Sequence, residues 1–207
     1  MTEPMHQSGG GTQTAVDHLA RTAAAEITSG MIVGLGTGRA ADRVTRELAR
    51  PVIEEKLDID CICTSSQTER LAAELKLPTV PFSDIEELDY LFDGAYEVDP
   101  QMRMLKGQYG AITRQRLVAE VANRRIFLAS EDKMVNRLGE KSPLAVTIIP
   151  FGIASIRNRL RDLGLVGVVR RKYDGEVFVS DGGGVLLDMA MPDRDPEELA
   201  AELDHIT

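Results

Sequence analysis

The chain has 207 residues, 43% of them hydrophobic, and a formal net charge of −9, which suits one large domain or a domain with a small partner. The negative charge argues against nucleic acid or an anionic membrane surface as the main partner, because either requires a clustered positive face. No apolar run approaches the roughly 18 residues of a membrane span, and residues 1–12 lack the apolar core of a signal peptide, so we expect a cytoplasmic protein.

Residues 1–12 include Gly9, Gly10 and Gly11 and are too polar to order themselves, so we predict a mobile tail. Helices and strands alternate from residue 13 to residue 140. The hydrophobic patterns predict helices at Ala15–Ile27, Ala40–Leu48, Gln67–Leu75 and Ala111–Asn123, and strands at Met31–Val33, Ile59–Cys63, Thr79–Pro81, Leu88–Phe92 and Arg125–Ala129. Strands separated by single helices indicate a Rossmann-like α/β domain, a parallel sheet with helices on both faces.

The pattern changes over residues 141–207, where we predict a small α+β lobe, ferredoxin-like in type. Its expected strands are Val146–Ile149, Val166–Arg171, Glu176–Val179 and Val185–Met191, and its expected helices are Ile153–Leu163 and Glu197–Ile206. Asp174–Gly175 and Asp181–Gly184 are typical of hairpin turns that need a positive φ.

Cysteine and histidine give no sign of a metal site. Cys61 and Cys63 lie in a predicted strand, where we expect them on opposite faces, unpaired and in a reducing compartment. The three histidines are scattered along the chain, so we expect no metal and no other cofactor.

A glycine-rich loop, Gly34–Gly38, follows the first predicted strand and leads into a helix. Backbone N–H groups at such a helix N-terminus form an anion site, to which Gly36, Thr37 and Gly38 would contribute. Its G-x-G-x-G spacing differs from the dinucleotide fingerprint, which makes a nicotinamide enzyme a weak alternative. Arg39 stands in the first helical turn, where the helix dipole disfavours a cation unless an anion is bound. It either contacts a phosphate or extends into solvent.

Ser65 and Ser66 precede another predicted helix. Ser66 and Glu69 fit a capping box, which explains the loop without a ligand, although contact with a ligand stays an alternative.

The segment Asp93–Pro100, followed by Lys106–Ala111, gathers acids, a lysine and glycines between two regular elements. It reads D-G-A-Y-E-V-D-P and then K-G-Q-Y-G-A. This pattern resembles the type A ribose-5-phosphate isomerase family, which reads D-G-A-D-E-[IV]-D-P and K-G-G-G-[AG]-A, and the similarity extends over residues 14–206.

The resemblance implies a homodimer that binds a small phosphorylated sugar. It assigns site roles to Asp93, Lys106 and Lys133, and it places Ser65, Ser66 and Gly107 at the sugar pocket. Lysines could stabilise the oxyanion of an enediolate, and Asp93 could assist ring opening.

The chain departs from the family where chemistry matters. Tyr96 replaces a second aspartate, and Gln108 and Tyr109 replace two glycines. We expect the rings of Tyr96 and Tyr109 beside the pocket, where they would narrow it or stack on a different ligand. Gln115 stands where the resemblance implies a glutamate general base, and an amide cannot accept the proton. Arg39 and Ala40 replace a Ser-Thr pair, and Val16 replaces a lysine.

Two functions follow, an aldose–ketose isomerase with a rearranged site or a homologue without turnover that binds a phosphorylated metabolite or a protein. A different reaction on a related sugar phosphate is a third. Glu97 or Asp99 could replace the base if Tyr96 reshapes the loop. Members of the family usually continue into one more strand after the last helix, so either this sequence stops before that strand or the large sheet lacks it.

Overall fold

The structure is a computed structural model that describes residues 10–206. Its large domain is built on four parallel strands in the order β2-β1-β3-β6. These are β1 (Ile32–Leu35), β2 (Asp60–Cys63), β3 (Leu88–Gly94) and β6 (Ala122–Leu128). The predicted Rossmann-like α/β fold is confirmed.

Helices cover both faces of this sheet. They are α1 (Gly10–Ala25), α2 (Arg39–Glu54), α3 (Ser66–Glu74) and α4 (Ile112–Glu120). Successive side chains of a strand face opposite ways. Tyr90 and Phe92 of β3 therefore join the cluster with α1 and α2, whereas Leu91 packs with Val118 of α4. Burial of these apolar side chains is the main term that stabilises the domain.

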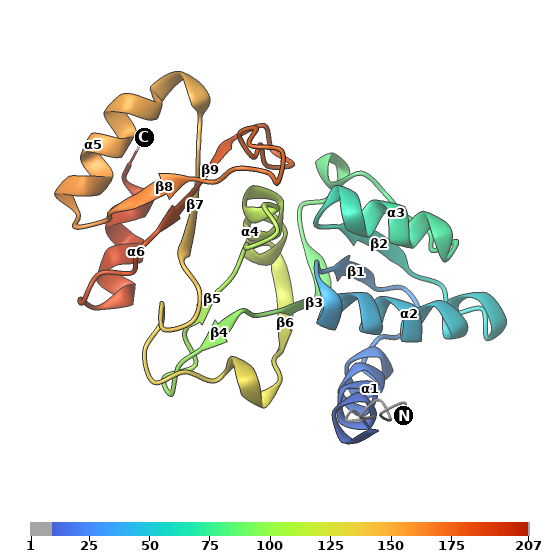
Figure 1. Ribbon diagram of the computed structural model, residues 1–207. Coiled ribbons are helices and arrows are strands. Elements are labelled where there is room, and N and C mark those ends of the chain that lie inside the picture. The colour runs from blue at the N-terminus through green and yellow to red at the C-terminus, as the bar shows by residue number, and fades with distance from the viewer. Residues whose placement is uncertain (1–9, 207) are drawn as a thin grey trace, which may run out of the picture.

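The second lobe has the expected α+β composition. It contains β7 (Leu144–Ile148), α5 (Ile153–Asp162), β8 (Gly167–Val169), β9 (Val185–Met189) and α6 (Pro196–Asp204). The strands form an antiparallel sheet in the order β7-β9-β8, and both predicted turns carry a glycine with positive φ, Gly175 and Gly183. Figure 1 shows this lobe on the opposite side of the molecule from α1, α2 and α3.

Several boundaries differ from the sequence predictions. Helix α1 begins at Gly10, inside the range expected to be a tail, and residues 1–9 of that range lie outside the described part. Helix α2 continues past the predicted end to Glu54, with Pro51 inside its last turns, although a proline there lacks the N–H that would bond one turn earlier. The predicted strands Thr79–Pro81 and Glu176–Val179 are reduced to isolated bridges.

The short ribbon β4 (Glu97–Val98) with β5 (Met104–Leu105) was not predicted, because two-residue strands carry no periodic pattern. Within residues 10–206 there are also three 3-10 turns, Phe82–Asp84, Glu131–Lys133 and Pro150–Gly152.

Cys61 and Cys63 are free thiols, as expected, but the expectation of opposite faces was wrong. Both pack against the cluster beneath α2, because residues two apart share one face of a strand. Burial raises the pKa of Cys61 to about 12 and that of Cys63 to about 11, so both are inert packing groups. In the part of the chain that the structure describes, no helix is both long and apolar enough to cross a bilayer.

The carboxyl ends of the parallel strands meet at one edge of the sheet, where open α/β sheets bind ligands. There Gly36 lets β1 approach β3, since a Cβ on it would lie 2.3 Å from the Phe92 carbonyl oxygen and 2.6 Å from the Asp93 Cα. The requirement for glycine at this position is therefore steric.

We predict that Gly36→Ala lowers the free energy of unfolding by about 1–3 kcal/mol, because the methyl group forces two backbones apart. Gly94→Ala is the control, since its Cβ would meet only ordinary contacts, 3.6 Å to the Ala40 Cβ. Urea denaturation of the three proteins measures the difference. Equal stability of the two variants would contradict the steric role of Gly36.

Candidate active site

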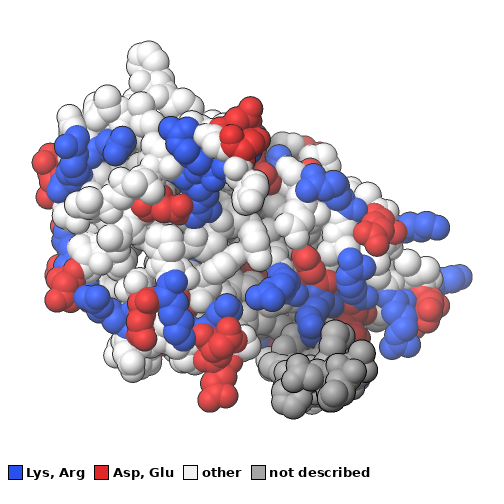
Figure 2. Space-filling model, viewed as in Figure 1, with Lys and Arg blue, Asp and Glu red and all other residues white. Residues whose placement is uncertain are grey.

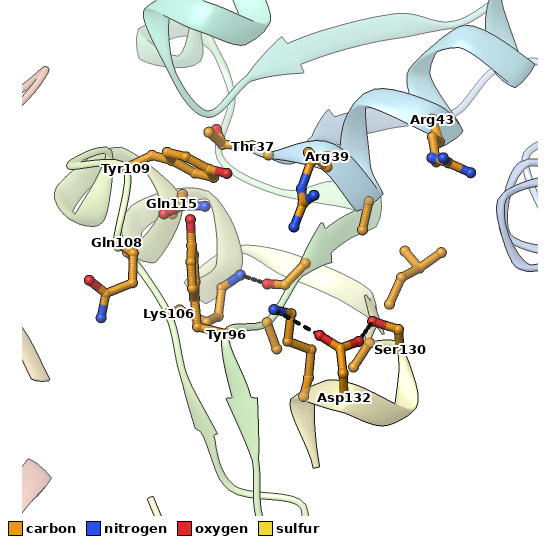
Figure 3. Close-up of a pocket in the computed structure, with 18 of the residues that line it drawn as sticks. Thr37, Arg39, Arg43, Tyr96, Lys106, Gln108, Tyr109, Gln115, Ser130 and Asp132 are labelled. Carbon is orange, nitrogen blue, oxygen red and sulfur yellow. Dashed lines mark hydrogen bonds and ion pairs between the residues drawn. The ribbon is translucent and has the colours of Figure 1, made fainter. Parts of the chain in front are cut away.

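A cavity of about 440 Å³ lies at this edge of the sheet, between the start of α2 and the loops after β3, β5 and β6. The predicted site residues that line it are Thr37, Gly38, Arg39, Tyr96, Lys106, Gly107, Tyr109, Gln115 and Lys133. Figure 3 shows many of these side chains directed toward one shared space. The fold thus brings together residues that lie up to 96 positions apart in the sequence, from Thr37 to Lys133.

Asp93 lies beneath the cavity floor at the end of β3 and is 1% exposed. Its Oδ1 accepts hydrogen bonds from the backbone N–H of Thr37 (3.0 Å) and Gly94 (2.8 Å). Its Oδ2 accepts from Gln115 Nε2 (3.0 Å) and lies 2.8 Å from Lys106 Nζ. A buried carboxylate needs such partners, because an unpaired charge would be costly to bury.

Lys106 brings a positive charge to the cavity wall. Its ammonium group pairs with Asp93, donates to the Gly94 carbonyl oxygen and lies 5.0 Å from the centre of the Phe127 ring. Its side chain is 24% exposed, so the amine is held in place yet open to a ligand. This geometry suits stabilisation of an oxyanion.

Gln115 is buried on α4 and uses its amide N–H group to bind Asp93. The amide thus serves as a donor at the position that the sequence comparison assigned to a base. Among the described residues, this leaves Asp132 as the carboxylate that lines the cavity, and it already pairs with Lys133 (3.3 Å) and accepts a hydrogen bond from Ser130.

The start of α2 faces the cavity with Gly38, Arg39 and Ala40. Gly38 is the N-cap residue and offers no side-chain cap, so the first-turn N–H groups can bind an anion. Arg39 points from this turn into the cavity, and Arg43 follows one turn later (Figure 3).

The Thr37 side chain does not face the anion site. Its hydroxyl shares hydrogen bonds with Thr64 (2.8 Å) and Thr68 (3.3 Å) in a buried network, and its N–H binds Asp93. The structure therefore assigns Thr37 to holding the loop together rather than to direct contact through its hydroxyl.

The cavity is basic although the protein is acidic. Among the residues that the structure describes, its lining carries Arg39, Arg43, Lys106 and Lys133 against the single lining carboxylate of Asp132. Figure 2 shows acidic and basic side chains interspersed over the visible face, so the charge of the cavity is local. A cluster of cations beside a helix N-terminus favours a ligand that carries phosphate.

Tyr96 and Tyr109 form one wall, with ring centroids 5.6 Å apart and ring planes at 63°. Burial, and after it the neighbouring Tyr109 side chain, raise the pKa of Tyr96 well above its ordinary value. Tyr96 is therefore neutral at physiological pH and acts as a hydrogen-bonding, apolar wall rather than as a base.

Four predicted site residues do not line the cavity. Asp93 lies under its floor, and Gly36 is enclosed between strands. Ser65 caps α3 by accepting from the Thr68 N–H (3.0 Å), and the Ser66 N–H binds Asp181 of the small lobe (2.7 Å). Helix capping therefore explains the Ser65–Ser66 loop without a ligand. The capping residue is Ser65, however, and not Ser66 as the sequence predicted.

Glu97 is not available as a substitute base. It is fully buried, and its carboxylate accepts from the N–H groups of Gly139 (2.6 Å), Lys141 (2.7 Å) and Ser142. Its role is to hold the segment that leads into the small lobe.

Asp99 is likewise committed to the loop. It accepts from the N–H groups of Gln101 (3.0 Å) and Arg103 (2.9 Å) and from Arg103 Nε (2.7 Å). Burial by itself would raise the pKa of Asp99, but these hydrogen bonds outweigh burial, so the pKa lies below its usual value. Neither Glu97 nor Asp99 lines the cavity.

The predicted site omitted Arg43, Gln108, Ala129, Ser130 and Asp132, all of which line the cavity. Arg43 could have been found, because it lies four residues after Arg39 and so shares its helix face. Within residues 10–206, no group of three or more His, Cys, Asp or Glu side chains could hold a metal ion.

The fold and cavity define a two-lobed α/β protein with a basic cavity at the carboxyl ends of its parallel strands. The sequence model of the family Ribose 5-phosphate isomerase A (phosphoriboisomerase A) matches residues 60–207. The chain belongs to this family.

Named relatives agree with this assignment. Ribose-5-phosphate isomerase A of Roseiflexus castenholzii is 41% identical over 194 residues, covering 90% of this chain and 83% of the relative. The protein of the same name from Chlamydia felis is 38% identical over 178 residues, covering 86% and 76%.

Solved structures give the same result. Ribose 5-phosphate isomerase A from Methanocaldococcus jannaschii superposes with a TM-score of 0.88 at 32% identity, covering 94% of this chain and 87% of that one. A D-ribose-5-phosphate isomerase in complex with phospho-erythronic acid superposes with a TM-score of 0.85 at 27% identity, covering 93% and 86%.

We predict that Asp99→Asn destabilises the protein at neutral pH and that the difference from the unmodified protein shrinks on acidification. A depressed folded-state pKa contributes stability above the unfolded-state value near 3.8, and this stability is lost as pH falls through the folded-state pKa. Urea unfolding between pH 2 and 7 tests this, with the exposed Asp58→Asn as control. A difference that stays constant with pH would contradict the assigned role.

Proposed function

We propose that this chain binds a phosphorylated sugar in the cavity and catalyses its aldose–ketose isomerisation, nominally of ribose 5-phosphate to ribulose 5-phosphate, with an altered site. The observation that carries the proposal is the Asp93–Lys106–Gln115 cluster beneath a cavity whose other end is a basic helix N-terminus. The relatives named as isomerases, and the neighbour bound to phospho-erythronic acid, support the ligand class. We also propose a cytoplasmic homodimer that needs no cofactor, on the resemblance alone.

Substrate orientation follows from the charges. A phosphate fits the first turn of α2 and Arg39, because N–H groups, the helix dipole and a guanidinium all favour an anion there. The reacting end of the sugar would then lie near Lys106 and Gln115. Lys106 would stabilise the oxyanion that develops on the carbonyl oxygen as a proton moves between adjacent carbons.

Proton transfer is the step for which the described residues offer the least support. Gln115 cannot accept a proton, Asp93 lies under the floor, and Asp132 is already paired. Absence of a positioned base typically costs 10²- to 10⁴-fold in rate, so we expect slow turnover. The same observation supports the second candidate function, binding of a phosphorylated metabolite without turnover.

We predict that Gln115→Glu raises the rate of isomerisation by about 10²- to 10⁴-fold. The new carboxylate would lie about 3 Å from Asp93 Oδ2, where the amide nitrogen is now. Two carboxylates so close do not both ionise readily, which raises one pKa toward neutrality and creates a competent base. NMR of ribose 5-phosphate and ribulose 5-phosphate, with and without a metal chelator, measures the rate.

Gln101→Glu is the matched control, because Gln101 lies outside the cavity and binds Arg103. No gain in Gln115→Glu over this control would contradict the role given to position 115. Absence of turnover in every protein would overturn the isomerase and leave the binding function.

We predict that Arg39→Ala weakens binding of inorganic phosphate and of ribose 5-phosphate by at least about 10-fold, since a charge-assisted hydrogen bond contributes about 1.5–3 kcal/mol. Arg46→Ala is the control on the same helix, because Arg46 pairs with Glu74 away from the cavity. Isothermal titration calorimetry measures both affinities. Unchanged binding in Arg39→Ala would place the phosphate elsewhere.

A further inference from the structure

The turn Gly107–Gly110 joins the cavity to the small lobe. The Gly110 N–H donates to the Gly107 carbonyl oxygen (2.9 Å), and both glycines have φ of 85°, in the left-handed region that favours glycine. The backbone shape of this turn is therefore well defined. Gln108 and Tyr109 occupy its tip and leave it in different directions (Figure 3).

Arg170, at the end of β8, holds Gln108 from the small lobe. Its Nη2 donates to Gln108 Oε1 (2.8 Å), and its Nη1 donates to the Gln108 carbonyl oxygen. Gln108 Nε2 in turn donates to the Pro143 carbonyl oxygen. The turn is thus tied to the small lobe through both the backbone and the side chain of one residue.

Arg170 is itself held rigidly. Its Nε lies 2.9 Å from Asp188 Oδ2 on β9, and its side chain is only 16% exposed. The guanidinium carbon lies 5.8 Å from the centre of the Phe178 ring. The same ring closes on the turn, since a Cβ on Gly110 would lie 2.5 Å from Phe178 Cε1. A partly buried, charge-assisted network of this kind fixes geometry well.

Tyr109 carries that geometry to the anion end of the cavity. Its ring lies on Gly38, the N-cap of α2, where a Cβ would come within 2.9 Å of Tyr109 Cε2. Its other neighbour is the Tyr96 ring. The ring of Tyr109, a residue that is 49% exposed, therefore covers Gly38 at the start of α2, and electrostatic attraction to an anion is stronger where water is partly excluded.

We infer that Arg170 is a positioning residue of the cavity, which acts through Gln108 to hold Tyr109 over the N-terminus of α2 and so sets the affinity for phosphate. The affinity part of this inference rests on the proposed function, whereas the position of Tyr109 can be measured without any ligand. The small lobe thereby takes part in the site without lining it.

The position of Tyr109 is tested by ¹⁹F NMR of protein labelled with 3-fluorotyrosine, which gives one signal for each of the 4 tyrosines. Tyr109→Phe assigns its signal. Arg170→Met should shift or broaden the Tyr109 signal, and Arg171→Met should not, because Arg171 binds the Gly175 carbonyl oxygen within its own hairpin. Should Arg170→Met fail to fold, Gln108→Ala removes the same contact from the other side. An unchanged Tyr109 signal in the folded variant would overturn the inference.

The affinity for inorganic phosphate is then measured by calorimetry in a double-mutant cycle. Arg170→Met should weaken binding about 2- to 30-fold, and it should have no further effect in a Tyr109→Ala background, because its action passes through that ring. Equal losses in both backgrounds would show an effect that bypasses Tyr109 and would overturn the inference. If the unmodified protein binds no phosphate, the proposed function fails, and the NMR measurement alone decides whether Arg170 positions Tyr109.

Discussion

The site depends on a buried carboxylate, that of Asp93. Its donors come from four places in the chain, the backbone at Thr37 and Gly94 and the side chains of Lys106 and Gln115. A carboxylate in a dry environment is tolerated only when its oxygens are satisfied, so the loops after β1, β3 and β5 and helix α4 must converge on it. The position of the cavity follows from this convergence.

The convergence also explains how an acidic protein presents a basic cavity. Asp93 is neutralised beneath the floor by Lys106, and Glu97 and Asp99 are turned toward backbone N–H groups away from the cavity. The acids of the loop thus support structure, while Arg39, Arg43 and Lys133 border the open space. The number of charged residues in a sequence does not distinguish acids that support structure from cations that border a cavity, because it says nothing about their burial or their bonding partners.

Among the described residues, the cavity offers several groups that can bind an anion but no free carboxylate. Lys106 and the start of α2 border the cavity, whereas the amide of Gln115 donates to Asp93 and the lining carboxylate of Asp132 is already paired with Lys133. Tyr96 and Tyr109 form one wall of the cavity. Arg170 of the small lobe binds Gln108, which lies in the same turn as Tyr109. On this fold, the presence of one group that can accept a proton would separate a slow isomerase from a protein that only binds its ligand.

The α/β class, most of the elements and both turns of the small lobe could be predicted from the amino-acid sequence, because periodic burial and glycine-rich turns are local properties. The sequence also led to the prediction, still untested, that Gln115 replaces the general base that the resemblance implies. The sequence could not show that the Thr37 hydroxyl faces inward or that Arg170 reaches the turn that carries Tyr109. Nor could it show that the carboxylates of Glu97 and Asp99 are already bound by other groups of the chain. Those outcomes depend on hydrogen bonds between residues far apart in the chain, and which partner a polar side chain finds is settled by packing in three dimensions.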